Sequence, residues 1–124
     1  MSTPVRIDLP NLVYHIYCRG NNKSPIFHER KDYQRFLARL EEYKDKFKVK
    51  IHAFCLLPNH FHLLVEPLKT GVKVFMHPLM TSYAKYFSFK YEAVGHVWQD
   101  RFQSIIVDKD NYFLTASKYI HLNP

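Results

Sequence analysis

The sequence predicts an α+β domain in which a four-stranded antiparallel sheet carries two helices on one face. Two observations predict this class. Four short segments are rich in β-branched and aromatic residues, as strands are, and two longer segments repeat apolar residues at helical spacing. The chain has 124 residues, of which 47% are hydrophobic. That size allows one compact domain with a single core.

The chain begins with a predicted strand and helix. Val13–Arg19 alternates in polarity, and Gly20-Asn21-Asn22 follows as a turn. A helix is expected from Asp32, its proposed N-cap, because apolar residues then recur every three or four positions on one side. These residues are Tyr33, Phe36, Leu37, Leu40, Tyr43 and Phe47.

The middle of the chain predicts a hairpin and a second helix. Val49–Leu57 and His60–Glu66 are expected to be strands on either side of a Pro58-Asn59 turn. Gly71–Tyr91 is expected to be helical, with Pro78 either beginning its regular part or kinking it. The supporting apolar positions are Val72, Phe75, Leu79, Tyr83, Tyr86 and Phe87, and we interpret the two tyrosines as core residues rather than a base-stacking platform.

The last part predicts one more strand and one more helix. A Gly95-His96 loop leads to a strand within Gln103–Asp108, and Asp110 is expected to cap a helix that runs to Asn123. The first six elements match the split β-α-β arrangement of a ferredoxin-like domain. The seventh is an extra helix able to lie near the central hairpin.

The composition favours a polyanionic partner. The net charge is +7, and the chain contains nine tyrosines, ten phenylalanines and one tryptophan. Basic surface with interleaved aromatic rings suits nucleic acid with unpaired bases, ahead of a membrane surface, although a merely soluble basic protein has the same charge. The candidate phosphate contacts are Arg19, Lys23, Arg101 and Lys118, with ordinary solvated charge as the alternative.

The two cysteines indicate a reduced, cytoplasmic setting. With only Cys18 and Cys55, no disulfide framework is expected, and in adjacent strands both would be small core residues. The N-terminus lacks the plan of a signal peptide, and no apolar run approaches the length of a membrane span.

Two histidines form the first candidate site. His60 and His62 are two residues apart in a predicted strand, so both imidazoles point to one face. Neighbouring imidazoles suit a divalent metal, while a pair of ordinary surface or core histidines is the alternative. The other histidines are interpreted as ordinary polar residues: His15, His28, His52, His77, His96 and His121.

The predicted last helix supplies the second half of the site. Tyr119 and Asn123 are four residues apart, which brings their Cβ atoms within about 5–6 Å on one helix face. Beside the histidines, they would complete a mixed nitrogen and oxygen set suited to Mg²⁺ or Mn²⁺. Tyr119 would then attack a phosphodiester and form a covalent phosphotyrosine, as in transposases, relaxases and replication nickases. Tyr112 is a rival nucleophile, but no amide follows it four residues later.

Five segments together resemble the single-tyrosine insertion-sequence transposases, and in particular the REP-associated tyrosine transposases. The resemblance extends over nearly the whole chain. The segments are Tyr14–Asn22, Leu57–Pro67, Ser82–Phe87, His96–Phe102 and Tyr119–Pro124.

The resemblance implies a ferredoxin-like fold, a divalent metal, and cleavage of single-stranded DNA, often beside a short hairpin. It places the metal ligands on His60, His62 and Asn123 and the nucleophile on Tyr119. A homodimer is expected on the same basis. Relatives commonly continue past this Asn-Pro with a basic tail, whereas this sequence ends at Pro124, and Ser88 stands where relatives often have asparagine.

Two other functions remain open at this stage. The first is a domesticated, non-catalytic nucleic-acid-binding module that uses the same sheet and basic surface. The second is a small metal-binding protein whose histidines serve structure alone.

Overall fold

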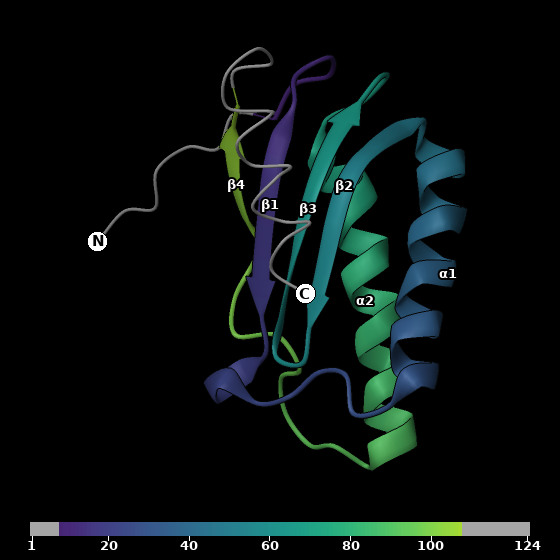
Figure 1. The fold of residues 1–124 in the computed structure, drawn as a ribbon, viewed down its shortest axis with the longest axis vertical. Coiled ribbons are helices and arrows are strands. Elements are labelled where there is room, and N and C mark those ends of the chain that lie inside the picture. Colours follow the sequence, from purple (N-terminus) through teal and green to yellow (C-terminus); the bar gives the residue numbers. More distant parts are fainter. Residues whose placement is uncertain (1–7, 108–124) are drawn as a thin grey trace.

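The computed structural model describes residues 8–107, and four of their segments form one antiparallel sheet in the order β2-β3-β1-β4. Both helices lie on the same side of this sheet, with α1 beside β2 (Figure 1). This is the predicted ferredoxin-like α+β fold. The strands are β1 (Tyr14–Arg19), β2 (Val49–Leu57), β3 (His60–Pro67) and β4 (Gln103–Ile106); the helices are α1 (Arg30–Phe47), α2 (Val72–Tyr91) and a short 3-10 turn, η1 (Asn21–Lys23). The predicted helix from Asp110 to Asn123 lies outside the described residues.

The start of α1 differs from the prediction. The helix begins at Arg30, and its N-cap is Glu29 rather than Asp32. Asp32 instead occupies the third helical position, where its carboxylate accepts the backbone N–H groups of His28 at 2.9 Å and Glu29 at 3.2 Å. Asp32 therefore stabilises the start of the helix from the third helical position and forms a capping box together with Glu29.

Pro78 neither begins α2 nor ends it. The helix starts at Val72, and Pro78 lies in its interior. The Asp8 carboxylate stabilises the first turn, because it accepts the backbone N–H of Val72 at 2.5 Å and that of Lys73 at 3.3 Å. The expectation that the regular helix begins at Pro78 is therefore wrong.

The main core lies between the helices and one face of the sheet. Alternate residues of β1 and β3 point into it, and Phe61 of β3 is fully buried there. Tyr83 of α2 is also fully buried, and its hydroxyl donates a hydrogen bond to the backbone carbonyl of Ile26. The prediction that Tyr83 is a core residue is confirmed, whereas Tyr86 is only half-buried.

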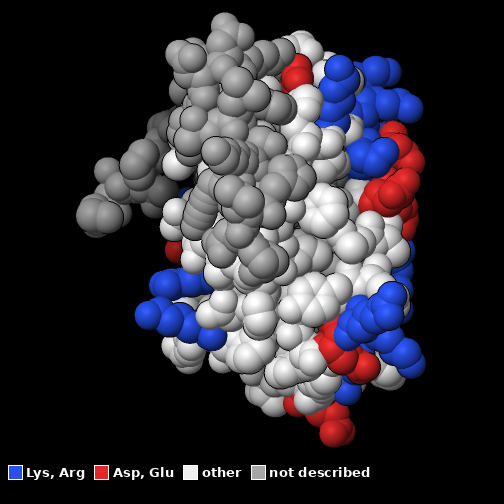
Figure 2. Space-filling model, in the orientation of Figure 1, with Lys and Arg blue, Asp and Glu red and all other residues white. Residues whose placement is uncertain are grey.

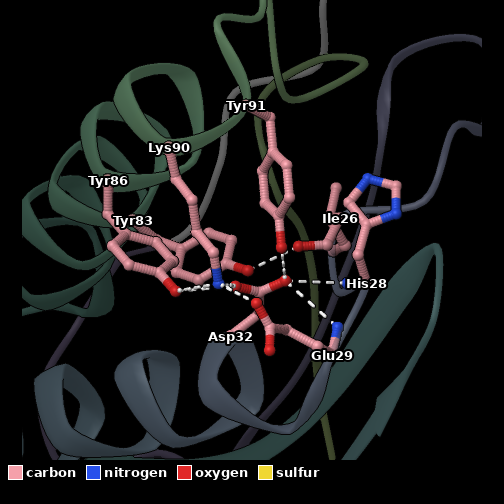
Figure 3. Close-up of polar contacts among 8 residues, drawn as sticks. All are labelled: Ile26, His28, Glu29, Asp32, Tyr83, Tyr86, Lys90 and Tyr91. Carbon is pink, nitrogen blue, oxygen red and sulfur yellow. Dashed lines mark hydrogen bonds and ion pairs between the residues drawn. The ribbon is translucent and has the colours of Figure 1, made fainter.

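A buried carboxylate joins the two helices. Asp32 is 0% exposed, and its carboxylate accepts hydrogen bonds from Tyr86, Lys90 and Tyr91 of α2 (Figure 3). Lys90 also pairs with Glu29 at 2.6 Å. Burial alone would raise the pKa of the Asp32 carboxyl, but the hydrogen bonds outweigh it and hold the pKa well below its usual range. The charged carboxylate thus ties the start of α1 to the end of α2.

The two cysteines are buried on opposite faces of the sheet. Cys18 belongs to the main core, whereas Cys55 packs in a smaller cluster on the other face. Their strands are separated by β3, so the adjacency that was considered is not present, but both are core residues as predicted. Burial raises the pKa of the Cys55 thiol.

Candidate functional site

His60 and His62 lie on the sheet face that the helices leave uncovered. Phe61, between them, points into the helical core, so the two imidazoles point the opposite way. Their ring centroids are 5.2 Å apart. The predicted side-by-side arrangement is therefore present.

Strand β1 adds two more rings to this pair. Tyr17 lies opposite His62 in the sheet register, and its ring centroid is 5.5 Å from that of His60 and 5.1 Å from that of His62. His15 Nε2 is 3.1 Å from His62 Nδ1. We call these four residues, His15, Tyr17, His60 and His62, the histidine cluster.

The sequence interpretation missed the role of His15, which it took for an ordinary polar residue. Alternation along β1 already places His15 and Tyr17 on one face. The predicted split β-α-β arrangement also sets β3 beside β1, so the two together could have placed His15 near His62, but the sequence interpretation did not combine them.

Hydrogen bonds at Nδ1 orient both predicted metal ligands. His60 Nδ1 is 2.8 Å from the side-chain oxygen of Asn59, which only accepts, so Nδ1 carries the proton and Nε2 the lone pair. When His62 donates from Nδ1 to His15 Nε2, it adopts the same tautomer. In metal sites the non-ligating ring nitrogen is held in this way by a neighbouring acceptor.

The sheet environment favours the neutral form of the three histidines in the cluster. Burial lowers the pKa values of His15 and His60. Burial, followed by repulsion from the positive forms of His15 and His60, lowers the pKa of His62 to about 4. Neutral imidazole is the form that ligates metals, so these histidines need not lose a proton before a cation binds.

The described residues supply only part of the predicted site. Within 8–107, no group of three or more His, Cys, Asp or Glu side chains is arranged to hold a metal ion. His15 Nε2 is engaged with His62 Nδ1, so this nitrogen cannot also hold an ion while the contact persists. Tyr119 and Asn123, the predicted nucleophile and amide ligand, lie outside the described residues.

The predicted phosphate contacts fall in two places. Arg19 is opposite His60 in the register, and the backbone carbonyl of Lys23 accepts a hydrogen bond from Asn59 beside it. Arg101 lines a separate groove next to α2, and Lys118 lies outside the described residues. Figure 2 shows one group of lysines and arginines at the lower left, where Figure 1 places η1, and further basic groups mixed with acidic ones along the right edge, where Figure 1 places α1.

A comparison with family models identifies the class of protein to which this chain belongs. The family model described as "Transposase IS200 like" matches residues 8–123. The chain therefore belongs to the IS200-like transposase family.

Two solved structures share the fold. One is described as the REP-associated tyrosine transposase bound to a REP hairpin; it is 22% identical, with a TM-score of 0.75, and the match covers 100% of this chain and 73% of that one. The other is a putative transposase from Deinococcus radiodurans R1. It is 14% identical, with a TM-score of 0.65, and the match covers 98% of this chain and 97% of that one. No curated protein sequence matches the chain significantly.

Neither described helix has the length and apolar character needed to span a bilayer.

Proposed function

We propose that this protein cuts and rejoins single-stranded DNA through a covalent 5′-phosphotyrosine, with the help of a divalent metal. The observation that carries the proposal is the pair of neutral, oriented imidazoles of His60 and His62 on the sheet face opposite α1 and α2. Membership in the IS200-like transposase family supports the reaction class.

The residues present fit a divalent cation. His60 and His62 offer two nitrogen ligands whose Nδ1 atoms are already engaged, and the amide of Asn123 is the proposed oxygen ligand. When bound, Mg²⁺ or Mn²⁺ would polarise the scissile phosphate and offset the negative charge that develops on it. His15 fixes the orientation of His62.

Tyr119 is the proposed nucleophile. Its phenolic oxygen forms a bond to phosphorus as the bond from phosphorus to the 3′ oxygen breaks, and the phenolic proton is balanced by the proton that the released 3′ hydroxyl takes up. A free tyrosine has a pKa of about 10, so the hydroxyl must be activated in the site. The phosphotyrosine conserves the energy of the broken bond, which permits rejoining without ATP.

The proposed substrate is a single strand beside a hairpin. A structural relative is described as bound to a REP hairpin. In this chain Arg19 is opposite His60 in the sheet register, and the backbone carbonyl of Lys23 accepts a hydrogen bond from Asn59, the residue before His60. Arg19 and Lys23 would contact phosphates on either side of the cleavage site.

A gel assay tests the proposal. The protein is incubated with end-labelled single-stranded DNA carrying a hairpin, with and without Mn²⁺, and the covalent adduct is resolved under denaturing conditions. We expect an adduct that requires metal, disappears in Tyr119→Phe, and persists in Tyr17→Phe. Tyr17 is the matched control because its ring contacts both histidines.

The same assay separates the alternatives. Hairpin binding without an adduct in the native protein would contradict the proposal and indicate a non-catalytic DNA-binding module. An adduct lost in Tyr17→Phe but kept in Tyr119→Phe would place the nucleophile on β1. Metal binding without any DNA binding would indicate a structural metal site.

A further inference from the structure

A second surface lies between α2 and the segment that leads to β4. Figure 1 shows this green segment passing from the end of α2 below the sheet to β4. Together they enclose an open groove of about 1050 Å³, and none of the histidine cluster lines it. Small-molecule pockets measure roughly 300–1,000 Å³, so this groove is at the upper end of that range.

The groove presents cations that have no ion-pair partner among the described residues. Lys73 and Lys85 line it from α2, and Arg101 lines it from the opposite wall. Its two carboxylates are engaged with backbone N–H groups: Asp8 accepts from the first turn of α2, and Asp100 accepts from Arg101 at 2.7 Å. The lining thus has three cations against two carboxylates, and no ion pair joins them among the described residues.

Trp98 gives the groove a fixed aromatic wall. Its indole N–H donates to the backbone carbonyl of Met80 at 3.0 Å, and its ring lies 5.6 Å from Phe61 and 6.0 Å from Tyr83, between centroids. The ring is thus held in place before any ligand arrives. Aromatic rings beside cations are the usual means of binding unpaired bases together with their phosphates.

The groove wall is joined to the end of β1 that carries the site. Gln99 N–H donates to the carbonyl of Arg19 at 3.0 Å, and Asn21 N–H donates to that of Val97 at 2.9 Å. Gly20 N–H in turn donates to the carbonyl of Asn59, the residue before His60, at 2.8 Å. The groove lies on the helix side of the sheet and the histidine cluster on the other side, so a DNA strand would reach the groove by passing around this end of β1.

We propose that the groove binds a single-stranded DNA segment that flanks the cleaved position, with its phosphates on Lys73, Lys85 and Arg101 and a base against Trp98. The inference rests on the proposed DNA substrate. It adds a contact surface that is separate from the reacting site.

The test compares two oligonucleotides: a hairpin with a single-stranded flank and the same hairpin without it. Affinity is measured by fluorescence anisotropy over a series of salt concentrations. The triple variant Lys73→Gln, Lys85→Gln, Arg101→Gln removes the groove cations. The control, Lys31→Gln, Lys46→Gln, Lys50→Gln, removes the same charge from exposed lysines outside the groove.

We expect the groove variant to bind the flanked hairpin at least roughly 10-fold more weakly than the native protein does. Each phosphate contact of a single strand contributes about 0.7 to the slope of log affinity against log salt concentration, so losing the groove cations should reduce the magnitude of this slope by about 2. The control variant should change the slope by less than half as much. Equal losses in the two variants, or no loss in the groove variant, would overturn the proposal.

Trp98 provides an independent readout because it is the only tryptophan in the chain. The flanked hairpin should quench its fluorescence, whereas the flankless hairpin should not. Unchanged emission with bound flanked DNA would contradict the stacking role. The native protein could show binding that depends on the groove cations and yet form no covalent adduct. That result would support the groove as a DNA-binding surface and contradict the proposed cleavage.

Discussion

His15 Nε2 lies 3.1 Å from His62 Nδ1, across the paired strands β1 and β3. One of these nitrogens donates and the other accepts, so the contact couples the tautomers of the two rings. The side chain of Asn59 acts in the same way on His60. His15 and Asn59 thus orient the two imidazoles that we propose as metal ligands.

The first prediction concerns this support. In His15→Phe, a ring remains but the acceptor is lost, so His62 should become a mixture of tautomers, and Mn²⁺ affinity should fall roughly 10- to 100-fold. Long-range ¹H–¹⁵N spectra of the imidazole nitrogens report the tautomer without metal, and calorimetry reports the affinity. His15→Gln, which retains a hydrogen-bond acceptor, should restore part of the tautomer preference and part of the Mn²⁺ affinity. His77→Phe, at an exposed histidine, is the control. An unchanged His62 signal in His15→Phe would contradict the proposal that His15 fixes the tautomer of His62.

The second prediction concerns pH. Because the folded-state pKa of His62 is about 4 and that of an unfolded histidine is about 6.5, the unfolded chain binds more protons between these values. Stability should therefore fall as the pH drops from 6.5 toward 4. Replacing His62 with Phe should flatten the dependence of urea-unfolding free energy on pH in this window. A slope identical to that of the native protein would contradict the burial of a neutral His62.

The third prediction concerns Asp32 and a lower pH range. Its folded-state pKa is depressed, so its contribution is present above the unfolded value of about 3.9 and is lost as the pH falls below it. At pH 7, Asp32→Ala should cost about 3–5 kcal/mol, because it leaves Lys90 without its buried partner. Asp45→Ala, on the same helix and in an exposed pair, should cost less than about 1 kcal/mol. Equal costs would show that the buried contacts do not stabilise the fold.

The parts of the fold that depend on local pattern were predictable. Alternation placed His60 and His62 on one face, and helical spacing identified Tyr83 as a core residue. Asp32 shows the limit of such reasoning. Aspartate favours the N-cap, but the same side chain can reach back from the third helical position, and the choice depends on what surrounds it.

The parts that depend on distant contacts were not predictable. Asp32 meets Tyr86, Lys90 and Tyr91 only because α1 and α2 pack together, and no periodicity encodes that meeting. The groove beside Trp98 likewise exists only once the loop after α2 returns to the end of β1. The proposed meeting of Tyr119 and Asn123 with the histidine cluster is of this kind and stays a prediction.

The fourth prediction concerns assembly. The family resemblance leads us to expect a homodimer, and light scattering coupled to size exclusion measures the mass directly. A mass near twice 14.9 kDa would agree with this expectation, and a mass near 14.9 kDa at micromolar concentration would refute it.

Mass spectrometry of the trapped adduct tests the central claim most directly. The native protein is reacted with a hairpin-bearing single strand and Mn²⁺, digested with nuclease and protease, and its peptides are sequenced. We predict one peptide that carries a nucleotide on Tyr119 through its 5′ phosphate. A nucleotide on Tyr112 or Tyr17, or cleaved DNA with no modified tyrosine, would contradict the mechanism.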